Sequence, residues 1–171
     1  MRLGIAAVAI IALGGFAAAQ HQHGGHTPYK GLQQRAVKAL SEQQVADLRA
    51  GRGMGLALAA ELNGYPGPMH VLELADQLAL SGELRRRTQE LYDAMKAEAV
   101  PMGETLIANE AALDRAFAER SISTDTLARL TAQIGETQAR LRAIHLKYHL
   151  ITAELLTPQQ RHRYAALRGY R

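Results

Sequence analysis

The strongest constraint on the fold is a heptad pattern that runs through residues 124–156. Mostly apolar side chains recur at the a and d positions of a seven-residue repeat, which is typical of a helix packed on another helix. The a positions hold Leu127, Ile134, Leu141, Tyr148 and Leu155, and the d positions hold Leu130, Thr137, Ile144 and Ile151. Thr124 can cap the start, and Pro158 disfavours helical geometry at the preceding residue. The pattern therefore predicts one helix of about 50 Å, which needs a partner surface.

A second long helical pattern begins after Ser81, a helix-capping residue type. Apolar side chains recur in it every eleven residues, a period that keeps a stripe nearly straight along a helix. The two series are Leu84, Met95, Leu106 and Phe117, and Leu91, Met102 and Leu113. Pro101 lies inside this helix and predicts a kink about one turn before it. Residues 121–123 form a short polar connection, so the two helices should make a long antiparallel hairpin.

Composition supports an all-α protein. Aromatic residues make up 5% of the chain and tryptophan is absent, whereas good helix formers dominate. Cysteine is absent as well, so neither disulfides nor thiol chemistry is available. Stability must therefore come from packing or from oligomerisation.

Shorter helices should flank the hairpin. Ser41 with Gln44 three residues later forms a capping box, and Thr157, Pro158 and Gln160 start a last helix that reaches Leu167. Between them, the glycines of GRGMG (residues 51–55) mark either a bend or a very close helix contact. A further short amphipathic helix is expected over residues 69–80.

The N-terminus has the features of a secretory signal peptide. Arg2 precedes an apolar stretch, and three alanines end at Ala19 before Gln20. An uncleaved anchor is the alternative, but the apolar segment is short for crossing a bilayer. Export with cleavage near Ala19 would leave 152 of the 171 residues. We expect residues 20–31 to be a flexible tail and residues 32–171 to be a single domain.

Two groups of histidines are candidate metal ligands. His21, His23 and His26 lie in the tail, where a flexible chain could fold around one ion; a solvated tail is the alternative. His145 and His149 are four residues apart, on one face of the predicted helix and close enough to share an ion. They fall at heptad positions e and b, which predicts an accessible pair beside the packed seam. The alternative is two partly solvated surface histidines.

Several function classes lack support. The net charge of +4 is spread among acids, and residues 85–87 (RRR) form the one local basic cluster, so we expect no nucleic-acid partner. No motif of a catalytic triad, carboxylate pair or nucleotide loop is present, so we predict that the protein is not an enzyme.

The sequence resembles the LTxxQ-motif family of small exported helical proteins, which includes Spy- and CpxP-like periplasmic chaperones and periplasmic heavy-metal sensors. The motif, Leu followed by Ser or Thr and then by Gln three residues later, occurs at residues 156–160 (LTPQQ) and at residues 40–44 (LSEQQ). Residues 80–84 (LSGEL) depart from it because leucine replaces the glutamine. Together with the signal segment and the predicted hairpin, the resemblance covers essentially the exported chain.

The resemblance implies a periplasmic hooked hairpin that forms a homodimer shaped as a cradle. In the chaperone branch this cradle binds unfolded proteins without ATP, and Arg85, Arg86, Arg87, Arg140 and Arg142 could border such a surface. In the sensor branch, histidines bind zinc, nickel, cobalt or copper and the protein signals to a membrane-bound partner. The two branches remain alternatives, and no cofactor is required in the first.

Overall fold

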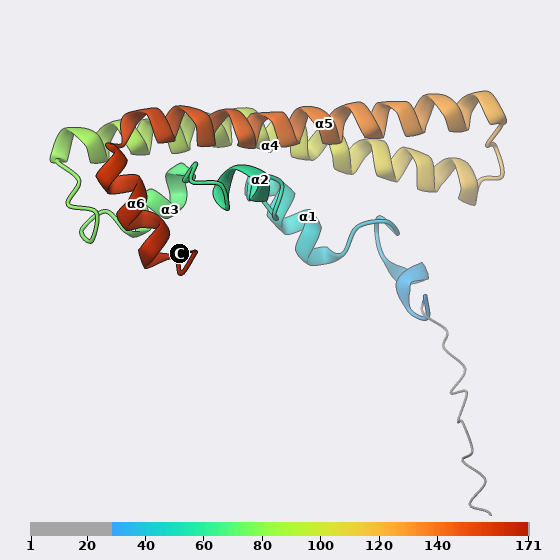
Figure 1. Ribbon diagram of the computed structural model, residues 1–171. Coiled ribbons are helices and arrows are strands. Elements are labelled where there is room, and N and C mark those ends of the chain that lie inside the picture. The colour runs from blue at the N-terminus through green and yellow to red at the C-terminus, as the bar shows by residue number, and fades with distance from the viewer. Residues whose placement is uncertain (1–28, 171) are drawn as a thin grey trace, which may run out of the picture. The chain divides into compact units, whose positions relative to one another are not determined.

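Two long helices dominate the computed structural model, which describes residues 29–170 (Figure 1). Helix α4 comprises Gly82–Ala118 and helix α5 comprises Thr124–Leu155, and they lie side by side. At 1.5 Å per residue they span about 55 Å and about 48 Å. The described residues contain no strand, so the predicted all-α class is confirmed. The predicted signal segment and the tail histidines His21, His23 and His26 lie outside the described residues.

Polar contacts across the helix pair show its direction. Asn109 on α4 donates to Thr137 on α5 over 3.1 Å, whereas Glu98 on α4 accepts hydrogen bonds from Lys147 and Tyr148. Lower residue numbers on α4 thus meet higher ones on α5, and the helices run in opposite directions. Burial and the hydrogen bond to Glu98 raise the pKa of Tyr148 to about 12.

The heptad seam is buried along most of α5. The buried seam positions are Leu130, Ile134, Thr137, Leu141 and Tyr148. The outer end differs from the prediction, because Leu127 and Phe117 are 38% and 54% exposed. Both lie near the 119–123 connection, where Figure 1 shows no third helix beside the pair. Two helices alone cover only part of each other, so the end of the stripe stays in water.

Most of the predicted helix boundaries agree with the structure. Ser81 caps α4, and Thr157 and Gln160 form a capping box at the start of α6, Pro158–Leu167. Helix α5 is capped by Ser123 rather than by Thr124, which is its first helical residue. Helix α4 continues unbroken through Pro101.

Short helices lie along one side of the pair. They follow a 3-10 turn over Leu32–Gln34 and comprise α1, Glu42–Arg49; α2, Leu58–Glu61; and α3, Pro68–Glu73. The capping box at Ser41 is present. Helix α3 is shorter than the predicted 69–80, because residues 74–80 form turns that include Ala79 at φ 50°. These turns bring Leu78 into a buried cluster with Val71, Leu156 and Tyr164.

Glycines shape how this layer meets the pair. Gly51 and Gly55 have φ of 65° and 82°, so the GRGMG segment is a bend between α1 and α2. At Gly103 on α4, an added Cβ would lie 2.6 Å from the carbonyl oxygen of Leu48 on α1. Only glycine allows α1 to approach α4 this closely. None of the helices in the described part of the chain is both long enough and apolar enough to cross a membrane.

Candidate functional site

A cavity of about 380 Å³ lies where the bend between α1 and α2 meets α3, α5 and residues 168–170. It combines both predicted histidines of α5 with charged and apolar side chains from the covering layer. The lining residues that matter below are Met54, Glu61, Met69, His70, His145 and His149. Arg52, Arg168 and Tyr170 complete its polar wall.

His145 and His149 are buried, and the predicted accessibility of this pair is wrong. Their exposed fractions are 2% and 9%. The covering layer packs over the e and b flank of α5: a Cβ on Gly53 would lie 3.6 Å from Nδ1 of His145, and one on Gly67 would lie 2.7 Å from Nε2 of His149. The heptad pattern describes contact with α4 only, so it carries no information about this second cover.

The hydrogen bonds of His149 define its protonation. Its Nδ1 lies 2.7 Å from the carbonyl oxygen of Tyr65, and because a carbonyl can only accept, Nδ1 carries the proton. The same nitrogen lies 3.6 Å from Oε2 of Glu61. A Cβ added to Gly67 would lie 2.7 Å from Nε2. His149 therefore ties the 65–67 turn to α5 through Nδ1.

His145 differs from its neighbour because it lacks a partner. Its Nε2 is the one fully buried side-chain nitrogen or oxygen among the described residues that has no hydrogen bond. Burial lowers the pKa of His145, and the nearby His149 lowers it further. The lowered pKa favours the neutral ring, and Nε2 makes no hydrogen bond.

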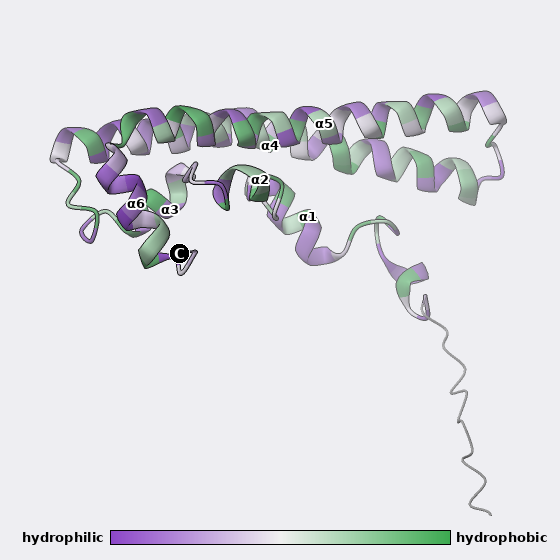
Figure 2. Cartoon of the chain, in the orientation of Figure 1, coloured by the Kyte–Doolittle hydropathy of each residue, from purple (hydrophilic) through white to green (hydrophobic). Residues whose placement is uncertain are grey.

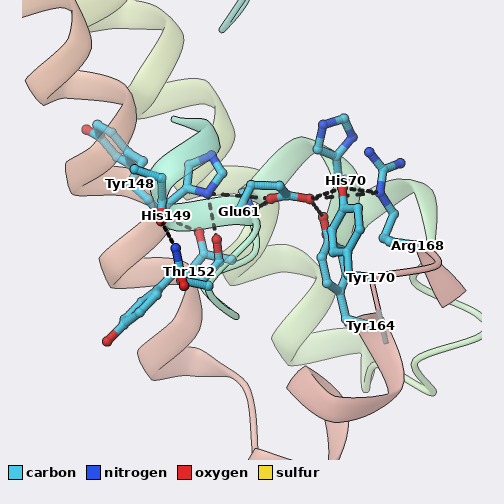
Figure 3. Close-up of polar contacts among 12 residues, drawn as sticks. Glu61, His70, Tyr148, His149, Thr152, Tyr164, Arg168 and Tyr170 are labelled. Carbon is cyan, nitrogen blue, oxygen red and sulfur yellow. Dashed lines mark hydrogen bonds and ion pairs between the residues drawn. The ribbon is translucent and has the colours of Figure 1, made fainter. Parts of the chain in front are cut away.

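Glu61 is the centre of the polar network beneath the cavity (Figure 3). Its Oε1 accepts hydrogen bonds from the hydroxyls of Tyr164 and Tyr170, the latter at 3.0 Å, and its Oε2 accepts from the backbone N–H of Gly67 at 3.3 Å. The guanidinium Nε of Arg168 lies 3.8 Å from Oε1. Glu61 is only 6% exposed, so these donors replace the water that a carboxylate requires.

This network connects four segments of the chain through the carboxylate of Glu61. It links α2 to the start of α3, to α6 and to the C-terminal Tyr170. Burial, with Glu61 as its acceptor, raises the pKa of Tyr164, so the phenol stays protonated as a donor. The arrangement positions α6 against the short helices and closes one end of the cavity.

A metal site at the two histidines of α5 needs further ligands. No group of three or more His, Cys, Asp or Glu residues between 29 and 170 is placed to hold an ion. Tail histidines His21, His23 and His26 lie outside the described residues, so the structure does not place them relative to this pair.

Most residues of the Glu61 network were not predicted from the sequence. Glu61, Tyr164, Tyr170 and Arg168 carry no motif; the available signal was the lone acid in the apolar run at residues 56–62 (LALAAEL). His70 also lines the cavity and lies 3.0 Å from the Glu73 carboxylate.

Five of the ten large apolar side chains that are exposed in the described chain fall between residues 54 and 69. We call them the apolar surface; they are Met54, Leu58, Leu62, Tyr65 and Met69, each at least 37% exposed. Figure 2 shows the hydrophobic colour of α2 in this region. Leu150 of α5, 51% exposed, lines a hollow together with Tyr65, and extends the apolar surface.

The arginines that could border a binding surface are largely paired with acids. Arg85 contacts Asp76 at 2.6 Å, Arg86 contacts Glu83 and Glu90, and Arg140 contacts Glu136 at 2.6 Å. Arg87 and Arg142 have no carboxylate within 4.0 Å among the described residues. Fewer of these arginines are therefore unpaired than the sequence alone indicates.

Comparisons with known proteins give no family to which the chain can be assigned: no protein-family model, no curated protein and no solved structure matches it.

Proposed function

We propose that this protein is an exported, periplasmic stress protein that holds partly unfolded polypeptides without ATP. The observation that carries the proposal is the apolar surface at residues 54–69. Leu58 is the first residue of α2 and Leu62 follows its last residue, and they are 53% and 56% exposed. Exposed apolar side chains gathered in one region mark a surface that binds other molecules.

Charge beside the apolar surface fits a polypeptide ligand. Arg52 and Arg168 line the adjoining cavity, and Arg161 lines the hollow beside Tyr65. Long cationic side chains present both an apolar stem and a charged head. Unfolded chains display mixed apolar and polar groups, so such a border supports weak binding of many sequences.

In this proposal the helix pair and α6 make up the hooked hairpin of the LTxxQ-type proteins, and two copies form a homodimeric cradle. A single hairpin with a one-sided layer presents its apolar surface on one side only, and a dimer would place two such surfaces around one client. The solution mass of the mature protein tests the dimer directly: a monomer at micromolar concentration would exclude it.

The test of client binding is suppression of aggregation. A reduced or heat-unfolded client should scatter less light in the presence of the mature protein, at a stoichiometric amount and without nucleotide. The double variant Leu58→Gln/Leu62→Gln should lose most of this effect. A control is Phe117→Gln/Leu127→Gln, which changes two apolar residues, 54% and 38% exposed, at the outer end of the pair. No suppression at several-fold molar excess of wild-type protein would exclude the function.

A periplasmic heavy-metal sensor, signalling to a membrane-bound partner, is the second candidate. The observation that favours it is the unpartnered Nε2 of His145, a nitrogen suited to zinc, nickel, cobalt or copper(II). Its other ligands would come from His149 after movement of the 65–67 turn, from the tail histidines, or from a second subunit. Divalent-metal titration of the wild type beside His145→Ala/His149→Ala tests this: equal affinities would exclude the site.

A further inference from the structure

The methionines of this chain are distributed in a way that burial does not explain. The chain has no cysteine and five methionines, of which four lie in the described residues. Met95 is buried and Met102 is half-buried on α4, as expected for side chains that fill a core. Met54 and Met69 are 42% and 37% exposed, and both line the same cavity.

The backbone of Met54 has an unusual conformation at the cavity. Its φ is 44°, in the left-handed region that residues with a side chain rarely adopt. Gly53 and Gly55 flank it, and the N–H of Leu56 donates to the carbonyl of Gly53 over 2.7 Å, which closes a tight turn around Met54. Such strained positions concentrate at binding sites, where the surrounding structure maintains them.

His70 brings an oriented imidazole to the same cavity. Its Nδ1 lies 3.0 Å from Oε2 of Glu73, and because a carboxylate accepts, Nδ1 is the protonated nitrogen. Nε2 then carries the lone pair, and no hydrogen bond from another described residue reaches it. Figure 3 shows the His70 ring next to the Tyr170 and Arg168 side of the cavity. A carboxylate behind the other nitrogen is the arrangement that orients metal-binding histidines.

We propose that Met54, Met69 and His70 form a site for a soft monovalent cation, Cu(I) or Ag(I). Thioether sulfur is a soft ligand and selects Cu(I) over the harder divalent ions, and imidazole is compatible with either. Glu73 would orient His70, and the GRGMG turn would present Met54. This site uses none of the residues of the divalent-metal hypothesis. Met54 and Met69 also belong to the apolar surface, but the client-binding test changes Leu58 and Leu62 instead, so the two proposals can fail separately.

The experiment is an oxygen-free competition between the full mature protein and a chromogenic Cu(I) chelator, combined with X-ray absorption of the copper-loaded protein. Wild type should show sulfur scattering around copper. The double variant Met54→Leu/Met69→Leu should lose the sulfur signal and bind Cu(I) more weakly, by roughly tenfold or more. The control Met102→Leu should match the wild type. Residues 20–31 contain no sulfur, so copper bound by the tail histidines cannot imitate this signal.

Two further variants test the imidazole. His70→Phe should weaken Cu(I) binding, and Glu73→Gln should weaken it by about tenfold through loss of orientation. Met to Leu exchange at exposed positions conserves volume, so unchanged far-UV circular dichroism is expected in all methionine variants. Wild-type affinity in the folded Met54→Leu/Met69→Leu variant, or copper without sulfur neighbours in the wild type, would overturn the proposal. If His145→Phe lost Cu(I) binding while His70→Phe kept it, the assignment of His70 would be overturned.

Discussion

At the scale of single residues, the site depends on which polar groups are buried with a partner and which are buried without one. Glu61 has three donors and two further cationic or imidazole neighbours, whereas His145 has no partner at its buried nitrogen. The first arrangement stabilises the fold, because each donor replaces water. The second leaves a buried nitrogen without a hydrogen bond, which is unfavourable.

The free energy of unfolding should fall as the pH drops below about 6.5, the ordinary pKa of an unfolded histidine. Burial and His149 lower the pKa of His145 in the folded protein, so the unfolded chain binds the proton more readily. This stability is therefore fully present above that pH and is lost as the pH falls toward the lowered pKa. His145→Phe should flatten the pH dependence measured by urea unfolding. A slope identical to that of the wild type would show that His145 is not the group responsible.

Tyr164→Phe removes one donor to the buried Glu61 carboxylate without opening a cavity. We expect the free energy of unfolding to decrease by about 1–3 kcal/mol, the usual cost of leaving a buried polar group less satisfied. The matched control is Tyr92→Phe on α4, since no described residue hydrogen-bonds to the Tyr92 hydroxyl. Equal stability of the two variants would contradict the role given to Glu61.

At the scale of elements, two glycines in long helices should respond to alanine in opposite ways. Gly103 meets the Leu48 carbonyl, so Gly103→Ala must push α1 away from α4 and should destabilise the protein by about 1–3 kcal/mol. Gly135 on α5 has open space around its position, so Gly135→Ala should stabilise by about 0.5–1 kcal/mol through helix propensity. Thermal unfolding of both variants measures the difference. A gain in stability in Gly103→Ala would contradict the close contact.

Local signals in the sequence identified the helix ends but not the covering layer. Ser41, Ser81 and Thr157 were predicted caps, and each accepts the expected backbone hydrogen bond, since capping depends only on residues three positions away. The burial of His145 and His149 depends on turns about 80–90 residues earlier in the chain. Periodicity along α5 records its contact with α4 and cannot record that second contact. The same limit explains the exposed Phe117, whose place in an eleven-residue stripe suggested a buried position.

The cavity could not be predicted from the sequence for a related reason. GRGMG was recognised as a bend or a close contact, and the structure shows that it is a bend with positive φ at Gly51, Met54 and Gly55. Nothing in the sequence indicates that this bend would meet Met69 and His70. Such a meeting results from the fold of the short helices around Glu61, a residue that carries no motif.

At the scale of the whole molecule, the layer of short helices lies along the pair of long helices and holds most of the residues on which the proposed client binding depends. The apolar surface, the cavity and the Glu61 network all involve residues of this layer. We propose that unfolded polypeptides bind specifically at the apolar surface and not at every place where apolar side chains are exposed.

Site-specific crosslinking tests this claim most directly. A photoreactive side chain placed at Leu62, directly after α2, should crosslink to an unfolded client, whereas the same group at Phe117 should not. The two positions are matched, because their exposed fractions are 56% and 54%. We expect crosslinks from position 62 alone, and only when the client is unfolded. Equal crosslinking from both positions, or crosslinking from position 117 alone, would contradict it.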